Sequence, residues 1–415
     1  MENRKMKPSS IEWIGDIPSD WEVSNIGGMY TVRNQKVSDR DYPPLSVTKQ
    51  GVLPQLDFVA KTNAHDDRKL VKKGDFAINS RSDRRGSCGV SEYDGSVSLI
   101  NTVLKPREQM NSAYYDWLFH TIQFGDEFYK NGHGIVDDLW TTNWQDMKKM
   151  RVPFPPLSEQ EEIAVFLNNE CSEIDTLSAD IQSQIDILEE YRKSVITEAV
   201  TKGLNPNATI KDSRIFYMAP YNTSWRLTKI GYECTKLWRS FQPEDTPLLC
   251  TNKGKVAVRP PEMLGKMVSE DNAMQGIHKG DIAIHGMDTW HGAIALSEYD
   301  GKITRVVHVC NSTQEKRFIV YYLQQLAFNG VYKLISNGVR GNTSDFRSWD
   351  KVKNIYIALP DINEQVEIAD YLDEKCAEIE AIIADKKAQL ETLADYKKSL
   401  IYEYVTGKKQ VKENA

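Results

Sequence analysis

The chain has 415 residues, of which 40% are hydrophobic and 27% are charged, and its formal net charge is −7. This is the composition of a globular protein with room for two or three domains, and it excludes a disordered or fibrous chain. No apolar run reaches the length of a membrane span, and the polar, basic residues 1–10 lack the apolar stretch of a secretory signal, so we expect a cytoplasmic protein. The six cysteines have no CxxC spacing and indicate reduced thiols rather than a metal site.

The negative charge is unevenly distributed along the chain. Residues 158–204 carry 3 basic and 11 acidic side chains, and residues 361–415 carry 8 and 13. Residues 1–157 balance at 21 each, whereas residues 205–360 carry 20 basic and 14 acidic side chains. Acidic side chains on long helices are typical of a solvated surface. The other two segments are neutral to basic, so an anionic partner such as nucleic acid can bind there.

Residues 1–157 are predicted to form a first α+β domain. Short alternating runs between Gly, Asp and Asn residues predict strands, most clearly at residues 75–79, 88–93 and 96–103. Residues 111–129 place Tyr, Leu and Phe at helical spacing and predict one helix.

Residues 158–204 are predicted to form one long helix. A proline-rich approach at residues 153–157 precedes it, Ser158 is a typical N-cap residue and Gly203 is a typical stop. The absence of Gly and Pro between these ends gives a helix longer than the usual limit of about 25 residues in globular proteins.

The same pattern occurs a second time, about 205 residues later. The dipeptide Glu159-Gln160 recurs as Glu364-Gln365, and Lys193-Ser194 recurs as Lys398-Ser399, without any gap. Before the helix, Ser-Glu-Tyr-Asp-Gly occurs in both copies. The chain is therefore interpreted as a tandem duplication, in which residues 205–360 form a second α+β domain and residues 361–415 form a second long helix with a tail. In this second helix Asn363 is the typical N-cap residue and Gly407 is the typical stop. The matching strands and helix of the second domain are predicted at residues 281–285, 293–299, 303–310 and 316–328.

Both helices show the spacing of a coiled coil. Large side chains alternate steps of three and four residues, which puts one seam along each helix, and the two copies are the obvious partners. Packing of each helix on its own domain is the alternative, and the length of the helices argues against it. If the copies are equivalent, the pair is antiparallel, with a pseudo-two-fold axis and one domain at each end. The predicted seam consists of Ile174, Leu177, Ile181, Leu188 and Tyr191 in the first helix and of Ile379, Ile382, Leu393, Tyr396 and Leu400 in the second.

The duplicated approach and helix, each after an α+β domain with a tryptophan near its start, resemble the specificity subunits of type I restriction–modification systems. The first copy reads Pro-Pro-Leu-Ser-Glu-Gln from Pro155 to Gln160, and the domains start near Trp21 and Trp225. The second copy departs slightly, with Leu-Pro-Asp-Ile-Asn before its Glu-Gln pair. The resemblance covers essentially the whole chain.

The resemblance implies that each α+β domain is a target-recognition domain that reads one half of a split, asymmetric sequence in double-stranded DNA. It implies that the helices are a spacer and the docking surface for two modification (methyltransferase) subunits, which bring S-adenosylmethionine and methylate adenine. Restriction subunits would bring Mg and ATP-driven translocation and cleavage. The chain itself would be a non-catalytic subunit that holds no cofactor.

The sequence contains none of the motifs that these reactions need. It lacks G-x-x-x-x-G-K-[ST] and the Asn-Pro-Pro-Tyr or Asp-Pro-Pro-Tyr of adenine methyltransferases. Pro360-Asp361 followed by Asp373-Glu374-Lys375 matches the loose nuclease pattern PD…(D/E)xK, but these residues lie at the approach to one helix and within it instead of converging on a metal, so we interpret the match as chance. Two other classes stay open: a stand-alone nuclease or methyltransferase, and a coiled-coil tether with two protein-binding domains.

Two loops in each domain are candidates for DNA contact, because the strands around them repeat while the loops change. The first loop spans residues 80–86 and corresponds to residues 285–292; the second spans residues 131–134 and corresponds to residues 336–342. Arginine can bond guanine and asparagine can bond adenine, although the same side chains can bind phosphates only or form ordinary solvated turns. The candidates are Asn79, Arg81, Arg84, Arg85 and His133 in the first domain, His285, His291, Arg340 and Asn342 in the second, and, as a further choice, Lys49, Gln50 and Lys253.

Overall fold

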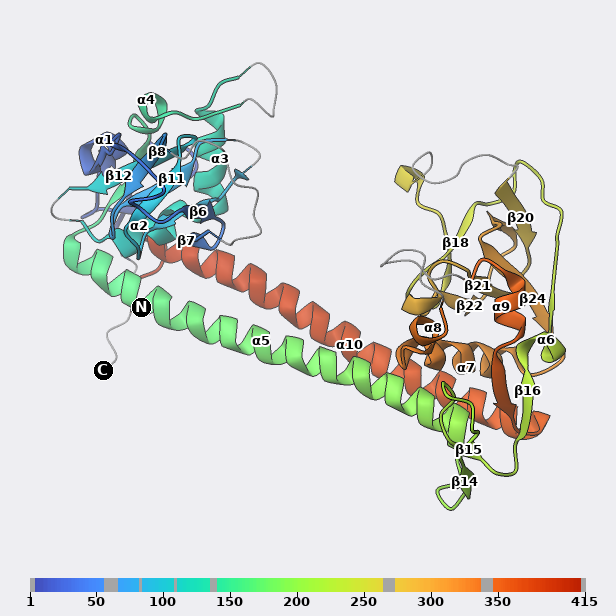
Figure 1. The fold of residues 1–415 in the computed structure, drawn as a ribbon. Coiled ribbons are helices and arrows are strands. Elements are labelled where there is room, and N and C mark those ends of the chain that lie inside the picture. The colour runs from blue at the N-terminus through green and yellow to red at the C-terminus, as the bar shows by residue number, and fades with distance from the viewer. Residues whose placement is uncertain are drawn as a thin grey trace. The chain divides into compact units, whose positions relative to one another are not determined.

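The computed structural model describes residues 4–55, 66–81, 84–107, 110–134, 140–263, 273–336 and 346–411. Its contacts divide the chain into two compact units, one made of Met1–Ile181 with Ala388–Ala415 and the other of Gln182–Lys387. Each unit contains one α+β domain and a segment of both long helices, α5 (Leu157–Lys202) and α10 (Ile362–Val405) (Figure 1). The predicted α+β fold with a duplicated domain-and-helix unit is confirmed.

The domain of the first unit is built from antiparallel strand pairs. Its largest sheet has the order β10 (Cys88–Val90), β9 (Phe76–Asn79), β12 (Asn101–Pro106) and β4 (Tyr30–Val32). A three-stranded sheet has the order β11 (Gly95–Ser98), β8 (Arg68–Val71) and β5 (Lys36–Val37). The remaining pairs are β1 (Met6–Pro8) with β2 (Asp16–Pro18), β3 (Glu22–Asn25) with β13 (Arg151–Phe154), and β6 (Leu45–Thr48) with β7 (Gly51–Pro54).

The domain of the second unit repeats this plan. Its four-stranded sheet has the order β17 (Cys234–Lys236), β24 (Val307–Ser312), β21 (Ile282–His285) and β22 (Ile294–Leu296). The other pairs are β20 (Met274–Ile277) with β23 (Gly301–Thr304), β16 (Arg226–Lys229) with β25 (Tyr356–Leu359), β18 (Leu248–Cys250) with β19 (Val256–Val258), and β14 (Ile210–Lys211) with β15 (Tyr221–Asn222).

Both domains also contain short helices. In the first domain these include α1 (Ile26–Met29) and α4 (Trp144–Met147). In the second they include α6 (Ile230–Glu233), α8 (Val331–Leu334), α9 (Trp349–Lys353) and the 3-10 turns η3 (Pro261–Met263) and η5 (Thr289–His291).

Three predicted elements of the domains are each divided in two. The single strand predicted at residues 96–103 is β11 and the start of β12, and the one predicted at 303–310 is divided between β23 and β24. The helix predicted at residues 111–129 is α2 (Ser112–Phe119) followed by α3 (Ile122–Lys130). The break occurs because the Thr121 hydroxyl accepts the Phe124 N–H at 3.2 Å and starts a new helix. In the second unit, α7 (Lys316–Phe328) is one helix, as predicted.

The Glu-Gln pair at the start of α5 is tied into the first domain. The Trp21 indole N–H donates to Glu159 at 2.7 Å. The Gln160 side chain is fully buried, and it donates to the Pro155 carbonyl at 2.8 Å and accepts the Asn111 N–H at 2.8 Å. A buried amide needs all of its partners, so this motif locks the helix start onto the domain.

The same lock occurs at the start of α10. The Trp225 indole N–H donates to Glu364 at 3.2 Å. Gln365 is fully buried, donates to the Pro360 carbonyl at 2.9 Å and accepts the Glu315 N–H at 3.1 Å. The repeated motif of the sequence is therefore a structural joint between domain and helix.

The predicted helix starts need a correction, whereas the predicted stops are confirmed. α10 is capped by Asp361, whose carboxylate accepts the Asn363 N–H at 3.0 Å, so Asn363 lies inside the helix. Ser158 likewise lies inside the first turn of α5. Gly203 and Gly407 follow the two helices with φ of +83° and +71°, the left-handed conformation that ends a helix.

The buried faces of the two long helices follow one repeated heptad register. Steps of four and three alternate from end to end, as expected for a coiled coil, and every position is buried or half-buried. On α5 these positions are Gln160, Ala164, Leu167, Cys171, Ile174, Ser178, Ile181, Ile185, Leu188, Arg192, Val195 and Ala199. On α10 they are Gln365, Ala369, Leu372, Cys376, Ile379, Ile383, Lys386, Leu390, Leu393, Lys397, Leu400 and Tyr404.

The seam predicted from the sequence is wrong at four of its ten positions. Leu177, Tyr191, Ile382 and Tyr396 are 48%, 55%, 46% and 51% exposed, and each lies one residue before the buried line. The reason is that polar residues such as Ser178 stand on the line, while a larger apolar residue stands beside them. The other predicted members lie on the buried line: Ile174, Ile181, Leu188, Ile379, Leu393 and Leu400.

An equivalent ion pair joins the two helices in each unit. Lys397 Nζ lies 2.6 Å from Asp175 in the first unit, and Arg192 Nη1 lies 3.0 Å from Glu380 in the second. The four positions correspond under the same shift of 205 residues. In the first unit the beginning of α5 packs on the end of α10, and in the second unit the end of α5 packs on the beginning of α10. The predicted antiparallel pairing is confirmed.

The corrected register predicts different costs for two isoleucines of α5. Ile185 is 1% exposed and Ile187 is 64% exposed. Ile185→Asp buries an unpaired charge and is expected to destabilise the chain by about 3 kcal/mol or more, whereas Ile187→Asp should change stability by less than about 0.5 kcal/mol. Thermal unfolding of both variants measures this. Equal melting temperatures would contradict the register.

Candidate nucleic-acid interface

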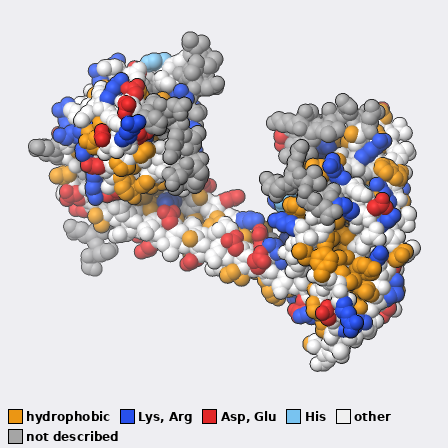
Figure 2. All heavy atoms as spheres, viewed as in Figure 1, with side chains coloured by type: hydrophobic (Ala, Val, Ile, Leu, Met, Phe, Trp, Pro, Cys, Tyr) orange, Lys and Arg blue, Asp and Glu red, His pale blue; other side chains and the backbone are white. Residues whose placement is uncertain are grey.

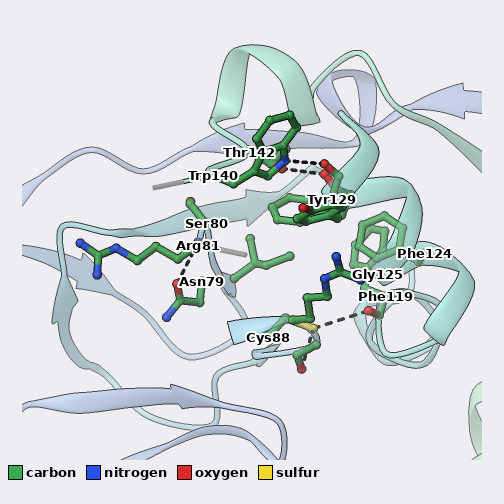
Figure 3. A pocket seen from close by; sticks show the side chains of 14 residues that line it. Asn79, Ser80, Arg81, Cys88, Phe119, Phe124, Gly125, Tyr129, Trp140 and Thr142 are labelled. Carbon is green, nitrogen blue, oxygen red and sulfur yellow. Dashed lines mark hydrogen bonds between the residues drawn. The ribbon is translucent and has the colours of Figure 1, made fainter. Parts of the chain in front are cut away.

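In the first unit the candidate loop leaves the central sheet at the end of β9. Asn79 is buried, and its side-chain oxygen accepts the Arg81 backbone N–H at 3.1 Å, which turns the chain away from the strand (Figure 3). Arg81, Arg84 and Arg85 are exposed. Asn79 therefore shapes the loop, and the three arginines present the positive charge of its surface.

The tertiary structure places the second candidate loop beside the first. Thr141 forms antiparallel bridges with both Arg81 and His133. The Thr142 N–H donates to the Ser80 carbonyl at 3.0 Å. His133 is exposed. The two loops, about 50 residues apart in sequence, thus share one surface, and residues 140–142 link them.

Aromatic side chains form the wall between the loops. The Arg85 guanidinium carbon lies 3.7 Å from the centroid of the Tyr129 ring, and Nη1 lies 3.4 Å from the Asp126 carboxylate. The Trp140 indole N–H donates to the Tyr129 carbonyl at 2.9 Å. Tyr129 and Trp140 help to line a cavity of about 20 Å³, enough for one water molecule (Figure 3). Its apolar lining includes Ile78, Cys88, Phe119, Phe124 and Phe128.

The second unit carries an equivalent loop at the end of β21. His285 Nδ1 accepts the Asp288 N–H at 3.1 Å, so this side chain turns the loop as Asn79 does in the first unit. Burial lowers the pKa of His285. The Phe346 N–H donates to the Gly286 carbonyl at 3.0 Å, which matches the link made by residues 80 and 142 in the first unit.

A second histidine of this unit lies beneath the loop. His308 on β24 is fully buried, and its Nε2 donates to the Phe346 carbonyl at 2.7 Å. Its Nδ1 has no hydrogen-bond partner within the described residues. Burial lowers the pKa of His308, so the imidazole is neutral and supports the fold.

The other DNA candidates lie at separate exposed positions. Lys49 and Gln50 are exposed at the β6–β7 turn, and Lys253 is exposed at the β18–β19 turn. His291 is exposed in η5. Arg340 and Asn342 lie outside the described residues. Exposed side chains of both charges cover the domains, and acidic ones recur along the helices (Figure 2).

Sequence reasoning missed the aromatic partners of the loops. In the first unit these are Tyr129 and Trp140, and in the second Trp290, whose ring lies 5.7 Å from Lys333 Nζ. The available signal was an aromatic residue a few positions from each glycine-rich loop. Cation–π pairing joins residues far apart in sequence, so no local spacing predicts it.

Possible metal ligands and thiols of the described residues are scattered or buried. Within the described ranges no group of three His, Cys, Asp or Glu side chains can hold a metal ion. All six cysteines are buried, and burial raises the pKa of Cys234 to about 11 and that of Cys250 to about 12, so these thiols stay protonated. No helix in the described part of the chain is long and apolar enough to cross a bilayer.

Comparison with known proteins shows which proteins this chain resembles. A family model described as the type I restriction modification DNA specificity domain matches residues 18–186. Two curated relatives from Methanocaldococcus jannaschii, the type I restriction enzyme MjaVIII and MjaX specificity subunits, are each 24% identical; the matches cover 95% and 96% of this chain and 94% and 96% of the relatives. Over almost its whole length the chain is similar to specificity subunits of type I restriction–modification systems.

The fold agrees with this assignment. A chain from a solved structure, described as the structural basis of complex assembly and conformational transition of the type I R-M system, superimposes with a TM-score of 0.70 at 13% identity. The match covers 94% of this chain and 98% of that chain. The resemblance found in the duplicated helix start is therefore confirmed over both halves.

The buried histidines predict that the stability of the second unit is sensitive to acid. The pKa of His308 is lowered in the folded state, so as pH falls below about 6.5 the unfolded chain binds a proton that the folded chain does not. Stability should be complete above about pH 7 and should decrease towards pH 5.5. Thermal unfolding of wild type and His308→Gln, which keeps a donor for Phe346, measures this. A pH dependence identical in both proteins would contradict it.

Proposed function

We propose that this specificity subunit recognises a bipartite, asymmetric sequence in double-stranded DNA, with one half read by each α+β domain. The observation that supports this most directly is that equivalent loops stand at equivalent places with different side chains. Arginines follow Asn79 in the first unit, whereas aromatic and imidazole groups follow His285 in the second. Different donors and acceptors read different bases.

The frame around these loops is the same in both units. Arg33 pairs with Asp75 at 2.6 Å in the first unit, and Arg239 pairs with Asp281 at 2.8 Å in the second. These carboxylates are buried and stand at the start of the strands that carry the loops. A constant frame with variable loops is the arrangement expected of recognition by surface loops.

The proposal includes two modification subunits that dock on the helices. Beside the buried seam, each helix carries a second stripe at steps of seven residues, and the two stripes are nearly identical: Leu177, Gln184, Tyr191 and Glu198 on α5, and Ile382, Gln389, Tyr396 and Glu403 on α10. Their apolar members are about half exposed. Exposed apolar groups at coiled-coil spacing suit a helical partner, and a repeated stripe suits two copies of it.

The chemistry is proposed to reside on the partners. Modification subunits would bind S-adenosylmethionine and methylate adenine, and restriction subunits would use ATP and Mg. This chain would supply sequence recognition and assembly, with no catalytic step of its own and a cytoplasmic location. A coiled-coil tether without DNA readout, the rival function, would show no salt-dependent DNA binding in the assembled complex.

Exchange of one domain tests whether each domain reads its own half of the DNA sequence. Replacement of residues 14–150 by the corresponding domain of another specificity subunit is expected to change one half of the methylated sequence and leave the other unchanged. Methylation-site mapping in cells that express the complete complex measures this. A change in both halves would show that the domains read DNA jointly.

Substitution of the exposed stripes tests the docking surface. Leu177→Asp together with Ile382→Asp should leave the melting temperature of the free chain within about 2 °C, since exposed sites rarely affect stability, but should prevent assembly with modification subunits. Val165→Asp is the matched control, because Val165 is 60% exposed and its counterpart in the second copy is already Asp370. Size-exclusion chromatography of co-expressed subunits measures assembly. Normal assembly of the double variant would refute docking through the stripes.

A further inference from the structure

Arg85 is held differently from an ordinary surface arginine. Its guanidinium stacks at 3.7 Å from the centroid of the Tyr129 ring, and one terminal nitrogen lies 3.4 Å from Asp126. Tyr129 and Asp126 are three residues apart on α3, so both stand on the same helix face. The Tyr129 main chain is in turn bonded by Trp140. Two residues of α3 therefore hold the Arg85 side chain in place.

Stacking immobilises a guanidinium without using its hydrogen bonds. The cation–π contact engages the face of the group, whereas its five N–H donors lie in the plane. The Arg85 side chain remains 49% exposed, so its in-plane donors are accessible although its orientation is restricted. An oriented planar fork matches the O6 and N7 acceptors of guanine in the major groove. A phosphate contact needs no such orientation, because a flexible cation serves equally well.

We propose, on the basis of the proposed DNA recognition, that Arg85 reads a guanine in the half-site of the first domain and that Tyr129 is the positioning residue that orients it. Arg85 is then a specificity-determining residue, and Tyr129 acts through it without contacting the base. Preorganisation lowers the conformational entropy that the arginine loses when it binds.

The second unit supports this assignment, because its equivalent loop also makes a cation–π contact with a helix, but with the two partners exchanged. There the loop supplies the aromatic ring of Trp290, and α8 supplies the cation, Lys333, at 5.7 Å. The loop of the second unit therefore offers no clamped arginine at this place. Both domains therefore contain a cation–π contact between loop and helix, but the cation belongs to the loop in the first domain and to the helix in the second. Under this proposal, the difference gives the two domains different base preferences.

The test uses the complete complex with four variants of the chain: Arg85→Ala, Tyr129→Leu, Tyr129→Phe and, as a control for loss of an exposed arginine away from the site, Arg107→Ala. Binding is measured against DNA duplexes that carry each base pair in turn at every position of the methylated motif, at several salt concentrations. The half-site of the second domain is an internal control for folding and assembly.

Arg85→Ala is expected to reduce discrimination at one G·C pair of one half-site by about 10-fold or more. The slope of log affinity against log salt should not change, because no phosphate contact is lost. Tyr129→Leu should reduce discrimination at the same base pair by a smaller factor. Tyr129→Phe should keep the discrimination of the wild type, because the ring face is retained. Arg107→Ala should behave as wild type.

Three results would overturn the proposal. Uniform weakening of all duplexes by Arg85→Ala with a smaller salt slope would make Arg85 a phosphate contact. Unchanged discrimination in Tyr129→Leu would show that the ring does not position the arginine. Loss of discrimination in both half-sites would show a general structural effect. Failure of the proposed function itself would appear separately, as absence of sequence preference in the wild-type complex.

Discussion

The antiparallel packing of α5 on α10 is the constraint on which both units depend, because each unit contains a segment of both helices. In the first unit the α10 segment comes from the far end of the chain. In the first unit, the Tyr114 hydroxyl donates to the Val405 carbonyl at 2.7 Å, and the Tyr402 hydroxyl donates to the Trp13 carbonyl at 2.9 Å. These contacts join residues almost 300 and 400 positions apart. The first domain therefore cannot complete its core until the last helix of the chain has formed, and loop closure of this length slows such steps.

The helix pair is specified as much by its polar residues as by its apolar ones. Arg192 and Lys397 occupy seam positions, where their aliphatic stems cover the neighbouring helix while their charged ends reach Glu380 and Asp175. Surface ion pairs contribute little stability on their own. Their value here is register: a helix that slips by one heptad loses both pairs at once. The apolar side chains beside the seam, such as Leu177, stay about half exposed.

The candidate DNA surface shows how the same arrangement of strands can hold loops of different chemistry in the two units. Side chains that hold the loops, such as Asn79 and His285, bond their own main chain and are replaced by functional equivalents in the two units. The residues that follow them change in chemistry. Recognition can therefore change by substitution in the loops, while the buried Arg–Asp pairs and the helix joints stay constant.

The sequence by itself determined the duplication, the α+β class, the two long helices and their antiparallel pairing. These features leave local or periodic signals: a repeat in one register, helix-breaking glycines such as Gly203, and apolar residues at steps of three and four. It also pointed to the loop after Asn79, because a changed loop between repeated strands is visible in one chain.

Only the tertiary structure decided which face of each helix is buried and what surrounds the loops. Whether Ser178 or its neighbour Leu177 faces the other helix depends on how the two helices pack. The sequence pattern predicted Leu177 because it is the larger apolar residue. The contact of Arg85 with Tyr129 joins two segments 44 positions apart through a ring face, which no sequence spacing encodes. The bridges of Thr141 to Arg81 and His133 likewise arise only when separate segments pack together.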